Sequence, residues 1–329
     1  MNPDIEGQEQ PTQNKYLLHS NAPVPRNIQK RFKATLNFKT SQTQHHENTG
    51  VDSLGKPEAS RPKKKEKCTF IHGNFANYYT YRNQGLDHDP RLDMLDKELF
   101  FDKHVLDIGC NSGFITTHIA LHFEPKNILG IDLDPVLIEK AWSHLKFEAS
   151  LLAPNSDSKQ VHFPISMPLL FGGIPLHGPP GFPSNASFEC VDITTKEACA
   201  DLLGQIDTVL VLSITKWIHL NGGDEAIKRF FRLIGRILAP GGKLVLEPQP
   251  WDSYSRRSSV SDTTAHHYPK IKFRPEKFEK FLVENVGLKL LLGTSTPSAN
   301  VKSGRLLNGT GFKRPIFIYQ KPLSLPSDK

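Results

Sequence analysis

The sequence has few cysteines and no long apolar run, so it lacks the usual signs of a disulfide-rich, zinc-binding or membrane-spanning protein. Only four of the 329 residues are cysteine (Cys68, Cys110, Cys190 and Cys199), and no two of them form a Cys-x-x-Cys pair. We therefore expect a reducing compartment, with neither a disulfide framework nor a metal site. No apolar run reaches the roughly 18–20 residues needed to cross a bilayer, and the first residues lack the apolar stretch of a signal peptide. A membrane partner is not expected either.

Apolar residues are also scarce, at 37% of the chain, and the shortage is marked near its start. Residues 1–67 are rich in Gln, Asn, Ser, Pro, Lys and His. They carry twelve Lys and Arg against seven Asp and Glu, which accounts for most of the formal net charge of +7. This composition predicts a disordered basic tail, which either attracts a polyanion such as RNA or simply keeps the chain soluble. The basic run over residues 61–67 is typical of a nuclear-import signal, an RNA-phosphate contact or a solvated linker.

Residues 68–322 indicate one α/β domain, followed by a short C-terminal tail over 323–329. Apolar runs alternate with amphipathic stretches, which predicts a mostly parallel sheet covered by helices on both faces. The expected strands are His104–Ile108, Asn127–Ile131, Ser187–Val191, Asp207–Leu212, Lys243–Glu247, Leu288–Leu292 and Pro315–Gln320. The expected helices are Phe114–Phe123, Pro135–Ala149, Lys196–Leu203, Asp224–Leu238 and Pro275–Glu284.

A Pro- and Gly-rich segment over residues 150–187 interrupts this alternation. It holds seven prolines and four glycines among 38 residues, and only Asp157 and Lys159 are charged. A structureless stretch of this length is unusual inside a compact domain. It is either a tolerated surface insertion or a lid near the site. The length and composition favour the surface insertion, whereas the aromatic residues, among them Phe171 and Phe182, are the argument for a lid.

A glycine turn at residues 107–113 (DIGCNSG) is the first sign of a cofactor site. It joins an expected strand to an expected helix. Gly109 lets a ligand approach the backbone closely, and the start of the helix offers unpaired N–H groups. The Gly-x-x-x-Gly spacing differs from the Gly-x-Gly-x-x-Gly that cradles a pyrophosphate, and the run lacks the Lys-Ser/Thr of a nucleotide P-loop.

Acidic residues stand at the ends of the next two strands. Asp132 can accept hydrogen bonds from both ribose hydroxyls of an adenosine ligand. Asp192 would lie near the adenine amine, with Ile193 packing on the ring. Because ligands of open α/β sheets bind at the carboxyl ends of the strands, the fourth strand, ending at Leu212, should open toward a substrate. Together, the glycine turn and Asp132 resemble the first two motifs of class I S-adenosylmethionine-dependent methyltransferases.

Three further blocks resemble one family more narrowly. They are residues 73–83 (GNFANYYTYRN), 212–225 (LSITKWIHLNGGDE) and 246–254 (LEPQPWDSY). With the glycine turn, they resemble the Bicoid-interacting RNA methyltransferases, and within that family most closely the methylphosphate capping enzymes of 7SK-type small nuclear RNA. The resemblance covers about residues 70–320, apart from the Pro-rich segment and a stretch near 293–310. It implies a class I methyltransferase fold, with a doubly wound, Rossmann-like sheet of seven strands, and S-adenosylmethionine as the cofactor.

The resemblance also implies a set of site residues. The cofactor contacts would be Tyr79, Arg91, Gly109, Cys110, Asn111, Asp132, Leu133, Asp192, Ile193 and Leu212. The residues facing the RNA end, and hence the catalytic candidates, would be Tyr78, Tyr81, Arg82, Lys216, Trp217, His219 and Trp251. We expect the planar fork of Arg91 to pair with the methionine carboxylate. Taken singly, Trp217 and Trp251 are also typical of a core, and His219 of a structural hydrogen bond; their clustering at strand ends favours function.

One position departs from the family pattern. Gly222 stands between Asn221 and Gly223, where the family usually carries Trp. The absence of an indole removes a large packing or stacking surface. We therefore expect a different substrate wall at this position, whereas the cofactor site does not depend on it.

The resemblance implies an enzyme that transfers a methyl group from S-adenosylmethionine to the 5′-terminal γ-phosphate of a small nuclear RNA. Two alternatives stay open: methylation of a 5′-monophosphate on tRNA or a small RNA precursor, and an RNA-binding scaffold that remains on its product within a ribonucleoprotein. The resemblance implies an RNA with a 5′-terminal phosphate as the partner. It further implies a La-related RNA-binding protein as a second partner, a monomeric state and nuclear localisation, with a cytoplasmic fraction also compatible.

Overall fold

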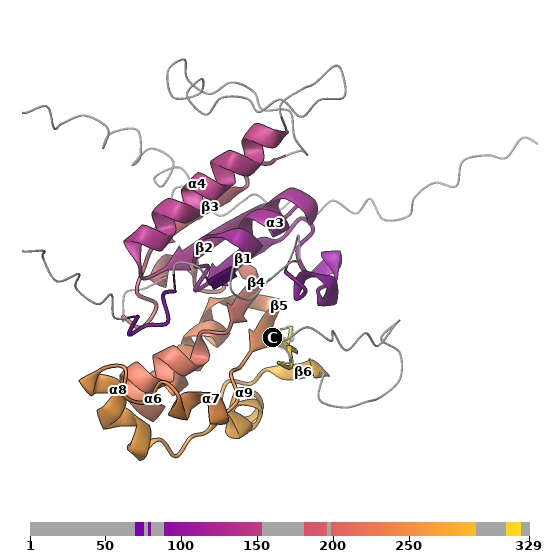
Figure 1. Cartoon of the computed structure of the whole chain (residues 1–329). Coiled ribbons are helices and arrows are strands. Elements are labelled where there is room, and N and C mark those ends of the chain that lie inside the picture. Colours follow the sequence, from indigo (N-terminus) through magenta and orange to yellow (C-terminus); the bar gives the residue numbers. More distant parts are fainter. Residues whose placement is uncertain are drawn as a thin grey trace, which may run out of the picture.

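The computed structural model describes residues 70–75, 78–79, 89–152, 181–195, 199–293 and 314–323 (Figure 1). The basic tail predicted over 1–67 lies outside these residues, as do 153–180 of the Pro-rich segment and most of the C-terminal tail. No helix within the described ranges is long and apolar enough to cross a membrane.

A seven-stranded sheet forms the centre of the structure, in the order β3-β2-β1-β4-β5-β7-β6. Neighbours from β3 to β5 in this order run parallel, whereas β7 is antiparallel to both β5 and β6. The strands are β1 (His104–Ile108), β2 (Asn127–Asp132), β3 (Ala186–Cys190), β4 (Ile206–Leu212), β5 (Leu238–Glu247), β6 (Lys289–Gly293) and β7 (Phe317–Gln320). Each overlaps a strand predicted from the sequence and ends within two residues of it, except that β5 begins five residues before the predicted start at Lys243.

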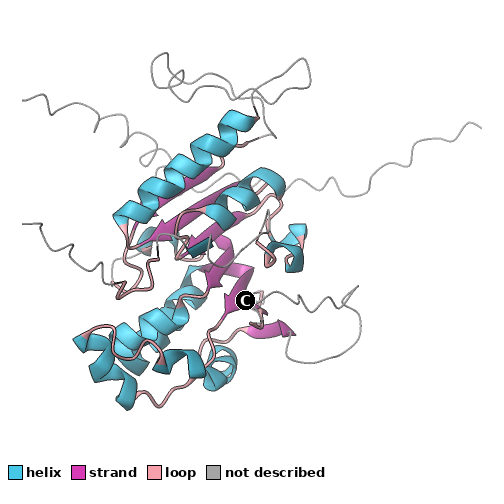
Figure 2. Cartoon of the chain, in the orientation of Figure 1, coloured by secondary structure: helices cyan, strands magenta, loops and turns pink. Residues whose placement is uncertain are grey.

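Helices cover both faces of the sheet, as Figures 1 and 2 show. α3 (Phe114–His122) and α4 (Pro135–Leu151) pack on one face, and α6 (Thr215–Ile237) and α9 (Phe278–Glu284) pack on the other. The short helices α7 (Asp252–Ser255) and α8 (Asp262–His267) lie beside α6. Single 3₁₀ turns are η1 (Leu92–Met94), η2 (Lys97–Leu99), η3 (Ala200–Leu202), η4 (Tyr268–Lys270) and η5 (Pro275–Lys277).

Two apolar cores, one on each face, hold these layers together. Successive side chains of a strand point to opposite faces, so Val105 enters the core under α3 and α4, while Leu106 enters the core under α6 and α9. On α6, the buried Ile227, Phe231 and Ile234 recur at helical spacing and face the sheet. This packing fixes the carboxyl ends of β1, β2 and β4 at one edge, where the site lies.

Helix α6 differs most from the sequence prediction. A helix was predicted from Asp224, but α6 begins nine residues earlier, at Thr215, and has a kink at Gly223 (φ 68°, ψ −171°). Its first turn is capped from a distance, because Gln249 Oε1 accepts hydrogen bonds from the Thr215 hydroxyl (2.9 Å) and from the backbone N–H of Lys216 (3.0 Å). The local sequence carries no cap, so the local pattern does not reveal where the helix starts.

Smaller differences concern the edges of other predicted elements. Of the helix predicted over 196–203, the described residues form only the 3₁₀ turn η3. The Pro-rich segment is shorter than predicted, because α4 extends to Leu151 and β3 begins at Ala186. Phe182, which was considered part of a lid, is buried in the core under α3 and α4.

Candidate functional site

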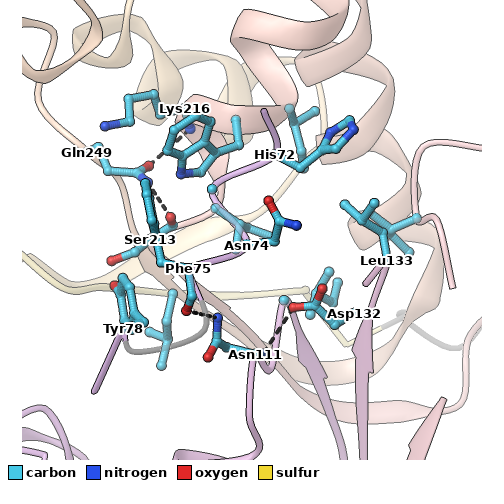
Figure 3. Close-up of a pocket in the computed structure, with 18 of the residues that line it drawn as sticks. His72, Asn74, Phe75, Tyr78, Asn111, Asp132, Leu133, Ser213, Lys216 and Gln249 are labelled. Carbon is cyan, nitrogen blue, oxygen red and sulfur yellow. Dashed lines mark hydrogen bonds between the residues drawn. The ribbon is translucent and has the colours of Figure 1, made fainter. Parts of the chain in front are cut away.

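A cleft of about 1490 Å³ opens at the carboxyl ends of the parallel strands. Residues 70–75 cross this cleft. In Figure 3, Asn74 of this segment lies between Asp132 on one side and Ser213, Gln249 and Lys216 on the other. We refer to the two parts as the Asp132 half and the Lys216 half.

The crossing segment is attached to both halves. Asn74 Nδ2 donates to Asp134 Oδ2 (2.7 Å) beyond β2, and Asn221 Nδ2 on α6 donates to the Ile71 carbonyl (2.9 Å). Gly73 lies against the Trp217 indole so closely that a Cβ atom would come within 2.1 Å of Nε1. The segment therefore holds the walls of the cleft at a fixed separation.

The glycine turn between β1 and α3 forms the floor of the Asp132 half. Gly109 has φ +78°, and a Cβ atom there would meet Ile214 Cγ2 at 2.3 Å. Gly113 has φ +74° at the start of α3, where a Cβ atom would approach both Ala141 and Phe188 to 2.7 Å. Both glycines of the Gly-x-x-x-Gly spacing are thus required by the backbone and by close packing.

The carboxylate of Asp132 is the central polar group of this half. Its two oxygens accept backbone hydrogen bonds from Asn111 (3.0 Å) and Asp134 (3.0 Å). Burial raises the pKa of Asp132 above its usual value, and these backbone hydrogen bonds oppose the shift. Since each carboxylate oxygen can accept a second hydrogen bond, the pair of oxygens fits the two adjacent hydroxyls of a ribose.

Most other predicted cofactor residues line the cleft with Asp132. They are Tyr79, Arg91, Gly109, Asn111, Leu133, Asp192, Ile193 and Leu212. The exposed Asp192 carboxylate accepts hydrogen bonds from the N–H (2.9 Å) and the hydroxyl (2.6 Å) of Thr194. Burial raises the pKa of Tyr79 well above its usual value, so this phenol stays protonated and can donate a hydrogen bond.

Cys110 is the exception among these cofactor candidates. Its side chain is 1% exposed and lies in the core under α3 and α4 rather than in the cleft. Its backbone N–H donates to the Ile131 carbonyl (3.0 Å) and so ties the glycine turn to β2. The turn brings the backbone of this residue near the site but directs its thiol inward, so the predicted cofactor contact of Cys110 would have to come from its backbone.

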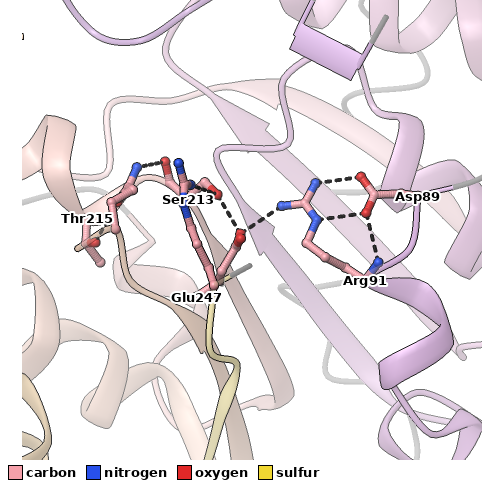
Figure 4. Close-up of polar contacts among 7 residues, drawn as sticks. Asp89, Arg91, Ser213, Thr215 and Glu247 are labelled. Carbon is pink, nitrogen blue, oxygen red and sulfur yellow. Dashed lines mark hydrogen bonds and ion pairs between the residues drawn. The ribbon is translucent and has the colours of Figure 1, made fainter. Parts of the chain in front are cut away.

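Arg91 reaches the cleft, but protein carboxylates bind its guanidinium (Figure 4). Nε and Nη2 contact the two oxygens of Asp89 (2.9 and 2.8 Å), and Nη1 contacts Glu247 Oε2 (2.9 Å). All three side chains are almost fully buried. The planar fork that we expected to hold the methionine carboxylate is therefore engaged by Asp89, and Arg91 instead links the cleft to the end of β5.

Asp107 is a buried residue of β1 that lines the cleft, and its carboxyl group should make the stability of the protein depend on pH. Burial raises the pKa of its carboxyl group from 3.8 to about 6, opposed by the Thr116 hydroxyl (2.6 Å) and by Arg91. Because the folded state holds this proton more tightly than the unfolded chain does, its contribution to stability is greatest below about pH 4 and falls by about 3 kcal/mol as the pH rises through 6. Chemical denaturation at several pH values between 4 and 7.5 should show that the free energy of unfolding declines more steeply with pH in the wild type than in Asp107→Asn. Identical slopes would contradict this assignment.

Basic side chains line the Lys216 half. They are Lys216, Arg256, Arg257 and Arg314, whereas Arg229 lines the cleft 13 residues further along α6, about 20 Å away. The acidic residues of the cleft lining within the described ranges are Asp107, Asp132 and Asp192, which belong to β1, to β2 and to the end of β3. The Lys216 half therefore attracts an anion, and it places that anion away from the carboxylates of the Asp132 half.

Sequence reasoning identified Lys216 but missed the three arginines beside it. Arg256 and Arg257 directly follow the block at residues 246–254, so a pair of cations at the end of a motif was the available signal. Arg314 lies 101 residues from Ser213, to which its Nη1 donates (2.8 Å). The sequence around either residue does not predict that contact.

Among the predicted RNA-facing aromatic residues, Trp217 and Tyr78 line the cleft. The Trp217 ring lies 6.0 Å from that of Phe75 and 5.1 Å from Lys216 Nζ. Tyr81 and Arg82 lie outside the described residues, so their predicted roles stay predictions.

His219 lies beneath the cleft rather than in it. Its ring is fully buried, with Nε2 2.9 Å from Asp224 Oδ1 and Nδ1 3.4 Å from the Tyr254 hydroxyl. Burial lowers its pKa below the usual range, although Asp224 opposes the shift. His219 is two residues from both Trp217 and Asn221, and therefore about 200° around the helix from these cleft residues. The structure thus places the His219 ring in the protein interior, outside the lining of the cleft that a catalytic residue was expected to face.

Trp251 likewise lies outside the cleft lining. Its ring stacks on Tyr268 (5.3 Å between centroids, 12° between planes), and the Arg274 guanidinium lies 4.7 Å from its centroid. These contacts attach the loop after β5 to η4 and η5. Trp251 therefore packs against Tyr268 and Arg274 outside the cleft lining, although the resemblance placed it among the residues that face the RNA end.

The Gly222 position is closed to a side chain in this structure. A Cβ atom there would meet Ala226 Cβ, one helical turn later, at 2.3 Å. We expect Gly222→Ala to lower the free energy of unfolding by about 1–3 kcal/mol through overpacking, despite alanine's higher helix propensity. Denaturant titration should show that Ala226→Gly restores stability to Gly222→Ala. Failure of the double variant to recover would contradict the clash.

Strand order, the antiparallel β7, the glycine turn and Asp132 at the end of β2 together define a class I S-adenosylmethionine-dependent methyltransferase fold. The family model described as Bicoid-interacting protein 3 (Bin3) matches residues 206–321. The U6 snRNA methylphosphate capping enzyme Amus of Drosophila melanogaster is 36% identical over 292 residues, which cover 84% of this chain and 86% of that protein. The chain belongs to the Bin3 family.

Two further relatives align with this chain over less than half of their own length. The 7SK snRNA methylphosphate capping enzyme of Mus musculus is 36% identical over 289 residues, covering 79% of this chain but only 42% of that protein. This chain therefore spans less than half of the mouse relative's length. The RNA 5′-monophosphate methyltransferase of Mus musculus is 27% identical over 171 residues, covering 45% of this chain and 47% of that protein.

Proposed function

We propose that this protein transfers a methyl group from S-adenosylmethionine to the 5′-terminal γ-phosphate of a small nuclear RNA. The observation that carries this proposal is the division of one cleft into an Asp132 half suited to a nucleoside and a Lys216 half lined by four cations. A methyl donor and a phosphorylated RNA end need such neighbouring but chemically different sites. The relatives matched over most of this chain, which are named as methylphosphate capping enzymes, support the same function.

The residues of the Asp132 half fit S-adenosylmethionine, which supplies an electrophilic methyl group. Asp132 would hold the ribose hydroxyls, and Leu133 and Ile193 would border the adenine, with Asp192 near its amine. The Gly109 turn lets the ligand approach the backbone. Tyr79 would donate its phenolic hydrogen to the amino-acid part of the cofactor.

The Lys216 half would bind and orient the phosphate. A terminal phosphate has a second pKa near ~6 and is mostly dianionic at neutral pH, so its oxygen needs no strong general base. This agrees with the burial of His219 away from the cleft. Lys216, Arg314 and Tyr78 would hold the other phosphate oxygens, leaving one oxygen in line with the methyl group at about 3 Å. Trp217 would stack on the first base, worth roughly 1–3 kcal/mol.

Charge favours the γ-phosphate over a 5′-monophosphate. Four cations exceed what one dianionic phosphate would neutralise, whereas a triphosphate carries about twice its charge. The monophosphate alternative is supported by a relative with lower identity and coverage. The scaffold alternative is compatible with the same basic wall but leaves the intact Gly109 turn and Asp132 without a purpose.

Labelled S-adenosylmethionine tests these alternatives against three RNAs of one sequence, ending in a 5′-triphosphate, a 5′-monophosphate or a 5′-hydroxyl. Labelling of the triphosphate RNA alone is the expected result, and labelling of the monophosphate RNA alone would favour the alternative substrate. Transfer to the hydroxyl RNA would contradict both. Tight binding without transfer would indicate a scaffold.

Nuclear localisation, a monomeric state and a La-related partner complete the proposal. The small nuclear RNA named in the capping relatives supports a nuclear site of action. Light scattering of the purified chain tests the monomeric state, and pull-down with a purified La-related protein, with and without RNA, tests the partner.

A further inference from the structure

A series of buried polar contacts runs between the two halves of the cleft through Glu247 and Ser213 (Figure 4). Glu247, the last residue of β5, is 1% exposed. Its Oε2 accepts hydrogen bonds from Arg91 Nη1 (2.9 Å) and from Ser213 Oγ (2.5 Å). Ser213 Oγ in turn accepts a hydrogen bond from Arg314 Nη1 (2.8 Å). One carboxylate and one hydroxyl therefore connect two arginines that line the cleft.

A second branch leads from Ser213 to the start of α6. Gln249 Nε2 donates to the Ser213 carbonyl, and Gln249 Oε1 accepts from the Thr215 hydroxyl and the Lys216 N–H. These side chains are all buried. Gln249 therefore contacts Ser213 and at the same time fixes the position of the Lys216 backbone.

The contacts at Glu247 and Ser213 depend on one another. A buried carboxylate is stable only while its donors stay in place, and hydrogen bonds in series polarise one another. Ser213 also has φ +63°, an uncommon conformation for a residue other than glycine. Its N–H donates to the Glu247 carbonyl (3.1 Å), so the backbone and the side chain of Glu247 both hold it there. Strain of this kind concentrates at functional sites.

We propose that Ser213 and Glu247 are positioning residues that couple cofactor binding in the Asp132 half to phosphate binding in the Lys216 half. Arg91 lies at one end of the series and lines the cleft together with Tyr79 and Asp107 of the Asp132 half, whose pKa values its charge lowers. Arg314 lies at the other end of the series, in the phosphate-binding wall. This inference rests on the proposed function, because it assigns one ligand to each half.

The test measures the affinity of S-adenosylhomocysteine by calorimetry, with and without saturating 5′-triphosphate RNA. We expect saturating RNA to raise the affinity of the wild type for S-adenosylhomocysteine about 5-fold or more, which is the lower end of typical coupling between sites. The ratio of the affinity with RNA to the affinity without RNA measures this coupling. Ser213→Ala should reduce this ratio to about 1 while leaving the affinity without RNA within about 2-fold. Arg314→Met, which interrupts the series at its far end, should also reduce the ratio.

Ser187→Ala is the matched control. Ser187 is fully buried on β3, and its hydroxyl has no hydrogen-bond partner among the described residues, so its loss should leave the ratio at the wild-type value. A wild-type ratio in Ser213→Ala and Arg314→Met, or a ratio of 1 in the wild type, would overturn the coupling. A wild type that binds the RNA without methylating it would instead refute the proposed function, so the two failures are distinguishable.

Discussion

Asp132→Ala is expected to abolish binding of S-adenosylmethionine and S-adenosylhomocysteine. The carboxylate lies at the end of β2, where backbone N–H groups from Asn111 and Asp134 orient both oxygens. Two hydrogen bonds from ribose hydroxyls to a charged acceptor, at about 1.5–3 kcal/mol each, correspond to an affinity loss of at least about 100-fold. Calorimetric titration with S-adenosylhomocysteine measures this loss directly.

The control for this prediction is Glu139→Ala, which removes an exposed carboxylate from α4 outside the cleft. It should bind the cofactor product as the wild type does. Thermal unfolding of the Asp132 variant separates loss of a ligand from loss of the fold, because two backbone contacts are also removed. A folded Asp132→Ala protein with wild-type affinity would contradict the role of this residue.

Lys216→Ala is expected to leave cofactor binding intact and to weaken RNA methylation. The Lys216 ammonium lies in the basic wall, 3.4 Å from the Ser253 carbonyl, and outside the contacts of Asp132. Loss of one charge-assisted contact to phosphate predicts a fall in kcat/KM for the RNA of about 10- to 100-fold. The affinity for S-adenosylhomocysteine should change by less than about 2-fold.

Lys228→Ala is a matched control on the same helix. Lys228 pairs with Glu225 (2.8 Å) and lies outside the cleft lining, so its removal should not alter kcat/KM. Equal losses in the two variants would indicate a general effect of positive charge on α6. An unchanged kcat/KM for Lys216→Ala would remove Lys216 from the phosphate site.

The sheet was predictable because its parallel strands are buried on both faces. Strands such as β1 and β4 then appear as continuous apolar runs, and the alternation with amphipathic stretches indicates their order in an α/β fold. The first half of α6 was not predictable in the same way. Its cap comes from Gln249, and the paired glycines before Asp224 suggest a helix start where the structure has a kink.

The candidate site was predictable where a residue stands at a strand end, and less so elsewhere. The position of Asp132 follows from the rule that carboxyl ends of parallel strands meet at one edge. His219 and Trp251 share motifs with cleft residues, but the rotation of a helix and the direction of a loop turn them away from the cleft. The Arg314–Ser213 contact joins residues 101 positions apart, a distance at which a single sequence carries no signal.

The most direct test of the proposed function locates the transferred methyl group on the RNA. The protein is incubated with 5′-triphosphate RNA and S-adenosylmethionine labelled in the methyl group, and the product is then treated with an enzyme that hydrolyses the bond between the α- and β-phosphates. Methylation of the γ-phosphate predicts that all of the label leaves the RNA in a small phosphate-containing product. Label that stays with the RNA chain, or no transfer to this RNA, would contradict it.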